Sequence, residues 1–135
     1  MYRQNRIVKS PLLIIIKEAK ARMFVHLKTK TIYSLLEGAI FAKALADRCV
    51  KFKMPAVGIA DRANLFGALE FSEVLSDKGI QPIIGCQLPM SARELNLKKS
   101  SVIDQLSMLF LAKSESGYRN LMELSSNFFL NEAYR

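Results

Sequence analysis

The sequence has few of the residues that build disulfide-rich, fibrous or membrane-spanning proteins. It contains only two cysteines, Cys49 and Cys86, whose wide separation excludes a disulfide framework and a zinc ribbon. Six glycines and four prolines are too few for a collagen-like or low-complexity chain. The longest apolar runs, 12–16 and 108–112, fall far short of the ~20 residues that a helix needs to cross a bilayer. These absences predict a folded, cytoplasmic protein without a membrane segment.

Several motifs of enzyme chemistry are also missing. There is one histidine, His26, and no pair of His, Asp or Glu residues has the spacing of a metal site. The chain has no G-x-x-x-x-G-K-[ST] phosphate loop and no G-x-S-x-G nucleophile motif. Motifs alone therefore predict no metal, no cofactor and no catalytic residue.

What the sequence does contain is a 50% apolar chain of 135 residues with a net charge of +8. This length is enough for one domain with a packed core. Residues 1–22 carry six basic side chains against one acidic side chain, so much of the positive charge lies at the N-terminus. We interpret residues 1–22 as a solvated basic leader of unknown origin, with contact to an acidic partner such as nucleic acid as the alternative.

From residue 23 onward, short apolar runs alternate with segments of helical period. This alternation is typical of β-α-β units and predicts an α/β fold with a mostly parallel sheet. Ser34 and Glu37 form an S-x-x-E capping box, which predicts a helix that Met54-Pro55 ends near Lys53. Phe41, Leu45, Cys49 and Phe52 should share one face of it. The other predicted elements are strands at 23–27, 56–60, 82–88 and 106–112, helices at 65–77 and 117–129, and a polar loop at 89–101.

Ligands of α/β proteins collect at the carboxyl ends of parallel strands. His26, Lys28 and Lys30 follow the first predicted strand and share one face of an extended segment, where Asp61 of the next strand could join them. The two lysines could hold a phosphate, with His26 as an acid or base. The alternative, which we prefer, is that the lysines are solvated and His26 is a hydrogen-bonded interior residue.

Four stretches at these strand ends resemble the PHP (polymerase and histidinol phosphatase) domain at the N-terminus of the bacterial DNA polymerase III alpha subunit. They occur in the order of the family and cover about residues 23–130. The matching stretches are Phe24–Ala39, Met54–Phe71, Gly79–Cys86, and Leu109–Lys113 together with Gly117–Leu121.

The resemblance implies a distorted seven-stranded (β/α) barrel, whose metal-bearing members hydrolyse phosphoesters. His26 and Asp61 keep the family's residues, but four other ligand positions do not. The H-x-H pair of the family falls on Lys28 and Lys30, the histidine of its T-D-H turn on Arg62, and a glutamate on Gln87. We therefore expect a degenerate metal site without metal, cofactor or catalytic residue, in which Lys28, Lys30 and Arg62 pair with Asp61.

Residues 23–135 would then be the N-terminal portion of a PHP domain, the first half of the barrel, from a truncated alpha subunit. The parent family is a DNA-directed DNA polymerase (nucleotidyltransferase), but we expect no enzyme activity from this chain alone. The role implied is structural support or subunit docking in DNA replication. Its partners would be the remainder of the alpha subunit and the proofreading exonuclease subunit, with DNA only indirectly. The alternatives are a residual phosphoesterase that uses His26 and Asp61, and a non-functional gene fragment.

Overall fold

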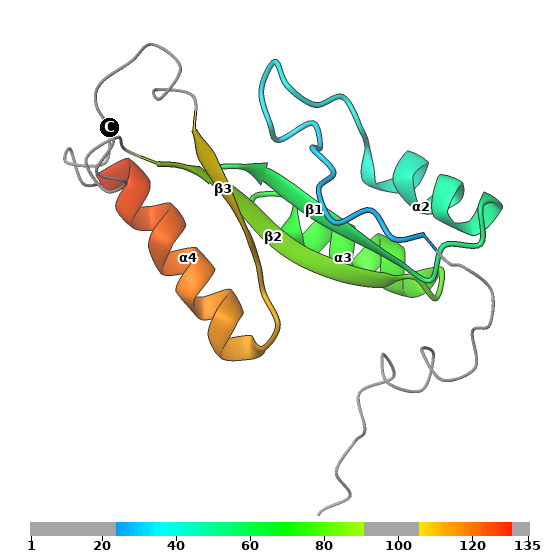
Figure 1. Ribbon diagram of the computed structural model, residues 1–135. Helices are drawn as coiled ribbons and strands as arrows, with labels where there is room; N and C mark the ends of the chain where they lie inside the picture. The colour runs from blue at the N-terminus through cyan, green and yellow to red at the C-terminus, as the bar shows by residue number, and fades with distance from the viewer. Residues whose placement is uncertain (1–23, 91–105, 131–135) are drawn as a thin grey trace, which may run out of the picture.

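The computed structural model describes residues 24–90 and 106–130, which build a mixed α/β fold around a three-stranded sheet (Figure 1). The predicted leader 1–22 and most of the polar loop 89–101 lie outside the described residues. None of the helices in the described part is long and apolar enough to span a membrane. The elements in chain order are α2 (Ala42–Lys51), β1 (Ala56–Arg62), α3 (Ala68–Asp77), β2 (Gln81–Pro89), β3 (Ser107–Leu111) and α4 (Glu115–Leu130).

The sheet has the strand order β1-β2-β3 and is only partly parallel. Strands β1 and β2 are parallel, as predicted, with Asp61 opposite Cys86. Strand β3 runs antiparallel to β2, which corrects the prediction of a mostly parallel sheet, and it places Ser107 opposite Pro89. A parallel pair needs a long crossover connection, usually a helix, and the polar segment after β2 has no helical period. Because β2 and β3 are antiparallel, Ser107 at the start of β3 lies beside the carboxyl end of β2.

The predicted first strand, Met23–Leu27, is not a strand in the described residues. This segment is joined to β1 by a parallel bridge between Thr29 and Ile59. In Figure 1 this segment crosses in front of β1. The main chain of Leu27 lies close to Gly58 of β1. A Cβ atom at Gly58 would lie 2.7 to 2.9 Å from backbone atoms of Leu27, so only glycine permits this crossing.

The predicted capping box does not start a helix. Helix α2 begins at Ala42, because Ser34 and Glu37 are engaged with residues of β1 and its neighbouring segment, as described below. Residues 34–38 form a turn, in which the amide of Gly38 donates to the carbonyl of Ser34 at 2.9 Å. Leu36 in this turn has a φ of 63°, a left-handed conformation that a helix start would not contain.

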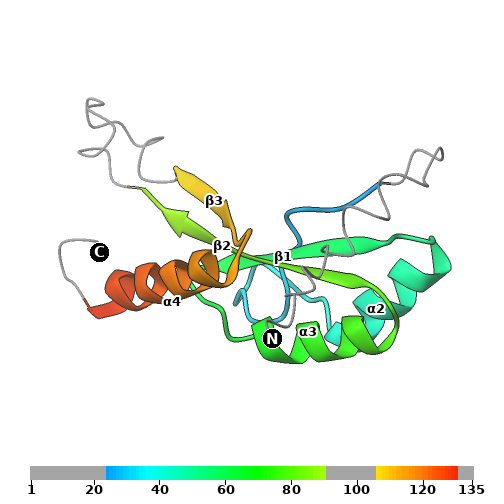
Figure 2. The ribbon, with the colours of Figure 1, turned by 90° about the horizontal axis from the view of Figure 1, so that it is seen from below.

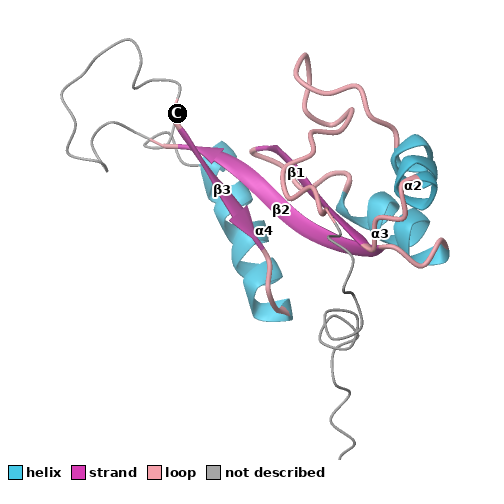
Figure 3. Cartoon of the chain, turned by 45° about the vertical axis from the view of Figure 1, so that its right-hand side comes forward, coloured by secondary structure: helices cyan, strands magenta, loops and turns pink. Residues whose placement is uncertain are grey.

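The three helices of the described residues pack against one face of the sheet (Figure 2). Alternate residues of β2 point to this face, where Ile84 contacts one core cluster and Leu88 belongs to a second. Figure 3 shows α2 and α3 side by side at one end of the sheet and α4 at the other. The first cluster is formed mainly by residues of β1, α2 and α3, with Phe71 and Leu75 fully buried. The second is closed by Leu121 of α4.

The predicted helix faces are confirmed for α3 and only in part for α2. Ala68, Phe71 and Leu75 of α3 are all buried. In α2, Leu45 and Cys49 are buried, but Phe41 is 61% exposed and Phe52 is 57% exposed. Both phenylalanines are cap residues at the two helix ends, beyond the part of the helix that packs on the core. The core list for these helices is Ala42, Leu45, Ala46, Cys49, Ala68, Phe71 and Leu75.

Helices α2 and α3 end in the same way but with different residues. After α3, the amide of Gly79 donates to Ser76 and the amide of Ile80 to Leu75, both at 2.9 Å, which is a Schellman motif. Gly79 has a φ of 71°, and the predicted glycine stop is confirmed. After α2, Lys53 occupies the equivalent left-handed position with a φ of 53°.

This difference predicts opposite effects of two substitutions on stability. Gly79→Ala should lower the free energy of unfolding by about 1 kcal/mol, because alanine resists a positive φ. Lys53→Gly should raise it by about 0.5–1 kcal/mol, because it removes the same strain. Urea unfolding of both variants measures the two shifts. A loss of stability in Lys53→Gly would show that the lysine side chain itself supports the helix end.

Candidate functional site

Asp61 lies near the carboxyl end of β1 and is almost fully buried, with 3% of its surface exposed. Its carboxylate accepts three hydrogen bonds from the preceding turn. The backbone amide and the hydroxyl of Thr31 each donate at 2.7 Å, and the Ser34 hydroxyl donates at 2.6 Å. The Ser34 oxygen in turn accepts the backbone amide of Arg62 at 3.1 Å. The hydrogen bonds to the Asp61 carboxylate therefore hold this turn against β1.

The cations of the site pair with Glu37, which corrects the expected partner Asp61. The Lys30 ammonium contacts Glu37 Oε2, and Arg62 Nη1 donates to Glu37 Oε1 at 2.7 Å. The hydrogen bonds from Lys30 and then Arg62 lower the pKa of the Glu37 carboxyl. The S-x-x-E pattern predicts a helix cap at Glu37 and does not predict these ion pairs. One signal was present, because it is the only carboxylate between residues 23 and 46.

A polar pocket of about 420 Å³ opens beside this ion pair. Gln87 on β2 lines it, and its side-chain amide donates to the Ser107 hydroxyl. Gln87 Oε1 is buried and has no hydrogen-bond partner among the described residues. Ser107 was not predicted as a site residue, because its place here depends on the antiparallel direction of β3. The lining residues are Lys30, Glu37, Arg62, Gln87, Pro89, Leu106 and Ser107.

The structure leaves His26 and Lys28 exposed on the segment that crosses β1. The interpretation of His26 as an interior residue is therefore wrong. The His26 ring lies edge-on to the ring of Phe24, with centroids 4.6 Å apart. Its carbonyl accepts the amide of Gly58, three residues before Asp61 and about 10 Å away along the strand. Of the predicted site residues, Lys30, Arg62 and Gln87 line one pocket.

The residues of this site do not fit a divalent metal ion. Protonated lysine and arginine have no lone pair to donate. The carboxylate of Asp61 is already engaged by three hydrogen-bond donors. Burial first, and then the charge of Asp61, raise the pKa of the neighbouring Cys86 thiol to about 11, so it is a poor ligand as well. In the described ranges, no group of three or more His, Cys, Asp and Glu side chains is placed to hold a metal ion.

The Glu37 ion pairs predict a small, pH-dependent contribution to stability. Glu37→Gln should lower the free energy of unfolding by under about 1 kcal/mol, because both pairs are partly exposed. The lowered pKa means that this contribution is present above the ordinary pKa of glutamate and is lost as pH falls through the folded value. Urea unfolding of both proteins at neutral and acidic pH measures it. A stability difference that grew on acidification would contradict this origin.

Comparison with known proteins assigns the class of this fold and site. The PHP domain family matches residues 26–135. The chain belongs to the PHP domain family, as the resemblance predicted. A crystal structure from Bifidobacterium adolescentis, described as a metal-dependent phosphoesterase, is similar in fold. Its TM-score is 0.51 and its identity 17%, and the match covers 76% of this chain and 33% of that one.

The curated relatives are more specific than the family. The chain is 47% identical to the DNA polymerase III alpha subunit of Caulobacter vibrioides over 86% of its own length and 10% of the relative. It is 39% identical to the same subunit of Treponema pallidum over 84% of this chain and 10% of the relative. The Helicobacter pylori subunit is also 39% identical, over 87% of this chain and 10% of the relative. The chain thus spans about a tenth of the length of these relatives.

Proposed function

We propose that residues 23–135 are the N-terminal portion of the PHP domain of a DNA polymerase III alpha subunit and that their role in replication is structural. In this proposal they form the first half of a distorted seven-stranded barrel, and residues 1–22 are a separate basic leader. The matches to polymerase alpha subunits and the α/β fold support it. Polymerase chemistry would reside in other parts of the subunit.

The observation that carries the proposal is the Glu37 bridge between Lys30 and Arg62. Lys30 and Arg62 occupy positions at which, by the sequence resemblance, metal-bearing members of the family have histidine. Fixed positive charge there replaces the charge of an ion, and Glu37 neutralises it. The bridge ties the 31–38 turn to β1, so the former ligand positions now stabilise the fold.

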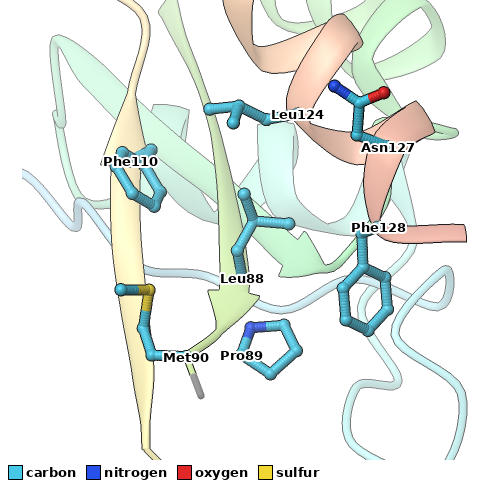
Figure 4. Close-up of a pocket in the computed structure, with 7 residues that line it drawn as sticks. All are labelled: Leu88, Pro89, Met90, Phe110, Leu124, Asn127 and Phe128. Atoms are coloured by element: carbon cyan, nitrogen blue, oxygen red, sulfur yellow. The ribbon is translucent and has the colours of Figure 1, made fainter. Parts of the chain in front are cut away.

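An apolar groove supports a contact with the remainder of the alpha subunit (Figure 4). It lies between the end of β2, β3 and α4, and it has a volume of about 240 Å³. Leu124 on α4 remains 41% exposed there, and β3 is an edge strand of the described sheet. Exposed apolar patches next to an unpaired strand edge are typical of surfaces that another segment covers. The groove residues are Leu88, Pro89, Met90, Phe110, Leu124, Asn127 and Phe128.

Co-expression tests this contact. This chain is produced together with a separate polypeptide that carries the remaining residues of the alpha subunit, and co-purification is measured. We expect a complex that Leu124→Glu abolishes and Ser126→Glu leaves intact, because Ser126 is an exposed α4 residue outside the groove. No complex with the wild-type chain would refute the structural role.

The same complex tests the proposed docking of the proofreading exonuclease subunit. Purified exonuclease subunit is titrated onto the assembled alpha subunit and onto the polypeptide that lacks this chain. Tighter binding to the assembled subunit would support docking. Equal binding to both would assign the docking surface to other parts of the alpha subunit.

A further inference from the structure

An exposed phenylalanine caps each end of helix α2. Phe41 and Phe52 are 61% and 57% exposed, and Arg48 lies between them in the sequence. Arg48 and Phe52 follow Phe41 by seven and eleven residues, close to two and three helical turns, so their Cα atoms fall near one line along the helix. The Cα atoms of Phe41 and Phe52 are about 16 Å apart along the helix axis. We call this line the basic aromatic side of α2.

The charge around this line is positive. Arg48, Lys51 and Lys53 are exposed on α2 and its C-terminal turn. The single carboxylate of α2, Asp47, pairs with Lys78, the C-cap residue of α3, and this contact lowers the pKa of Asp47. The Lys51 ammonium lies 5.9 Å from the centre of the Phe52 ring, so a cation covers one side of the ring and its exposed surface remains open.

Both ends of α2 carry residues that do not favour helix stability. Phe41 is the N-cap residue and makes no side-chain cap hydrogen bond, where serine or aspartate would add one. Lys53 has a positive φ at the position where α3 has Gly79. Such departures from local preference are expected where a residue serves binding rather than folding.

We propose that the basic aromatic side of α2 binds single-stranded nucleic acid, with bases stacked on Phe41 and Phe52 and phosphates near the cations between them. Separated aromatic rings flanked by cations are the arrangement that binds single strands without sequence preference. A membrane surface is a less suitable partner, because it binds a helix through a continuous apolar face. In α2 the apolar face, which contains Leu45 and Cys49, is buried in the protein core. The surface uses no residue of the Glu37 site.

Fluorescence anisotropy of a labelled oligothymidylate with the full chain tests the proposal. Phe41→Ser and Phe52→Ala should each weaken binding by about tenfold, since each removes one stacking ring. Phe41→Ser should at the same time raise the Tm, because serine caps the helix. Loss of affinity with a gain of stability cannot result from unfolding. Phe66→Ala is the matched control, because Phe66 is 72% exposed but lies outside α2.

Charge variants separate this surface from the basic leader. Arg48→Gln should reduce the slope of log affinity against log salt by about 0.7, the value for one lost phosphate contact on a single strand. Arg119→Gln, an exposed charge on α4, should leave the slope unchanged. Unchanged oligonucleotide affinity in both phenylalanine variants would overturn the proposal. So would binding to phosphatidylserine vesicles that Phe41→Ser abolishes while oligonucleotide binding is unaffected.

Discussion

Asp61→Ala is expected to destabilise the fold by about 3–5 kcal/mol, the largest effect of any change at the strand ends. The substitution removes the acceptor of three hydrogen bonds from Thr31 and Ser34. Thr31 is fully buried and Ser34 is 2% exposed, so water cannot replace the carboxylate. Each donor left unpaired in the interior costs about 1–3 kcal/mol. A loss of this size is a large fraction of the stability of a small domain.

Two further variants identify the cause of this loss. In Asp61→Asn the side chain keeps one oxygen that accepts hydrogen bonds, and its NH₂ group can donate to a hydroxyl oxygen. Asp61→Asn should therefore lower the free energy of unfolding clearly less than Asp61→Ala. Asp47→Ala removes an exposed carboxylate from an ion pair and should have a much smaller effect. Urea unfolding measures all three. Equal losses in Asp61→Ala and Asp47→Ala would show that the hydrogen bonds to Asp61 contribute little.

Phe71→Ala is expected to cost about 3–5 kcal/mol. Phe71 is the largest fully buried side chain in the described residues and lies in the core cluster shared by β1, α2 and α3. Removal of the ring leaves a cavity that these three elements cannot close completely, and the lost transfer free energy adds to the cavity cost. The effect should reach α2 because Leu45 and Cys49 belong to the same cluster.

Phe66→Ala is the matched control for this prediction. It removes the same ring from a position that is 72% exposed, so the free energy of unfolding should change by less than about 0.5 kcal/mol. Thermal and urea unfolding of the two variants give the comparison. Similar losses in both variants would mean that Phe66 is covered in solution, contrary to its exposure in the structure.

Local signals predicted the parts of the fold that depend on nearby residues. The face of α3 with Ala68, Phe71 and Leu75 follows from helical period alone, and its end follows from Gly79, because only glycine adopts a positive φ without strain. Strands β1 and β2 were recognised as short apolar runs bounded by polar residues. β1 starts where predicted and ends two residues later, and β2 is one residue longer than predicted at each end.

The capping box and the direction of β3 could not be decided locally. Ser34 and Glu37 have the right spacing for a cap, but Asp61, Lys30 and Arg62 offer them stronger partners from distant parts of the chain. Charge-assisted hydrogen bonds of this kind outweigh the modest gain from a helix cap. The direction of β3 depends on how the chain returns to the sheet, which its own residues do not specify.

The sequence predicted the location of the candidate site more accurately than the contacts within it. Lys30, Arg62 and Gln87 do line one pocket at the strand ends, and Asp61 lies buried beside them. Thr31, Ser34, Glu37 and Ser107 were missed. Thr31 and Ser34 are common residues whose hydrogen bonds to Asp61 span about thirty positions, and such long-range contacts leave no periodic signal.

We expect cations and hydrogen bonds, rather than a metal ion, to complete the strand-end site. Titration of Mn²⁺ into the isotopically labelled chain tests it, because the paramagnetic ion broadens NMR signals of nearby nuclei. We expect the signals of Thr31, Asp61 and Gln87 to broaden no more than that of exposed Asp47. Saturable broadening confined to Thr31, Asp61 and Gln87 at one ion per chain, accompanied by phosphomonoester hydrolysis that His26→Ala abolishes, would contradict it.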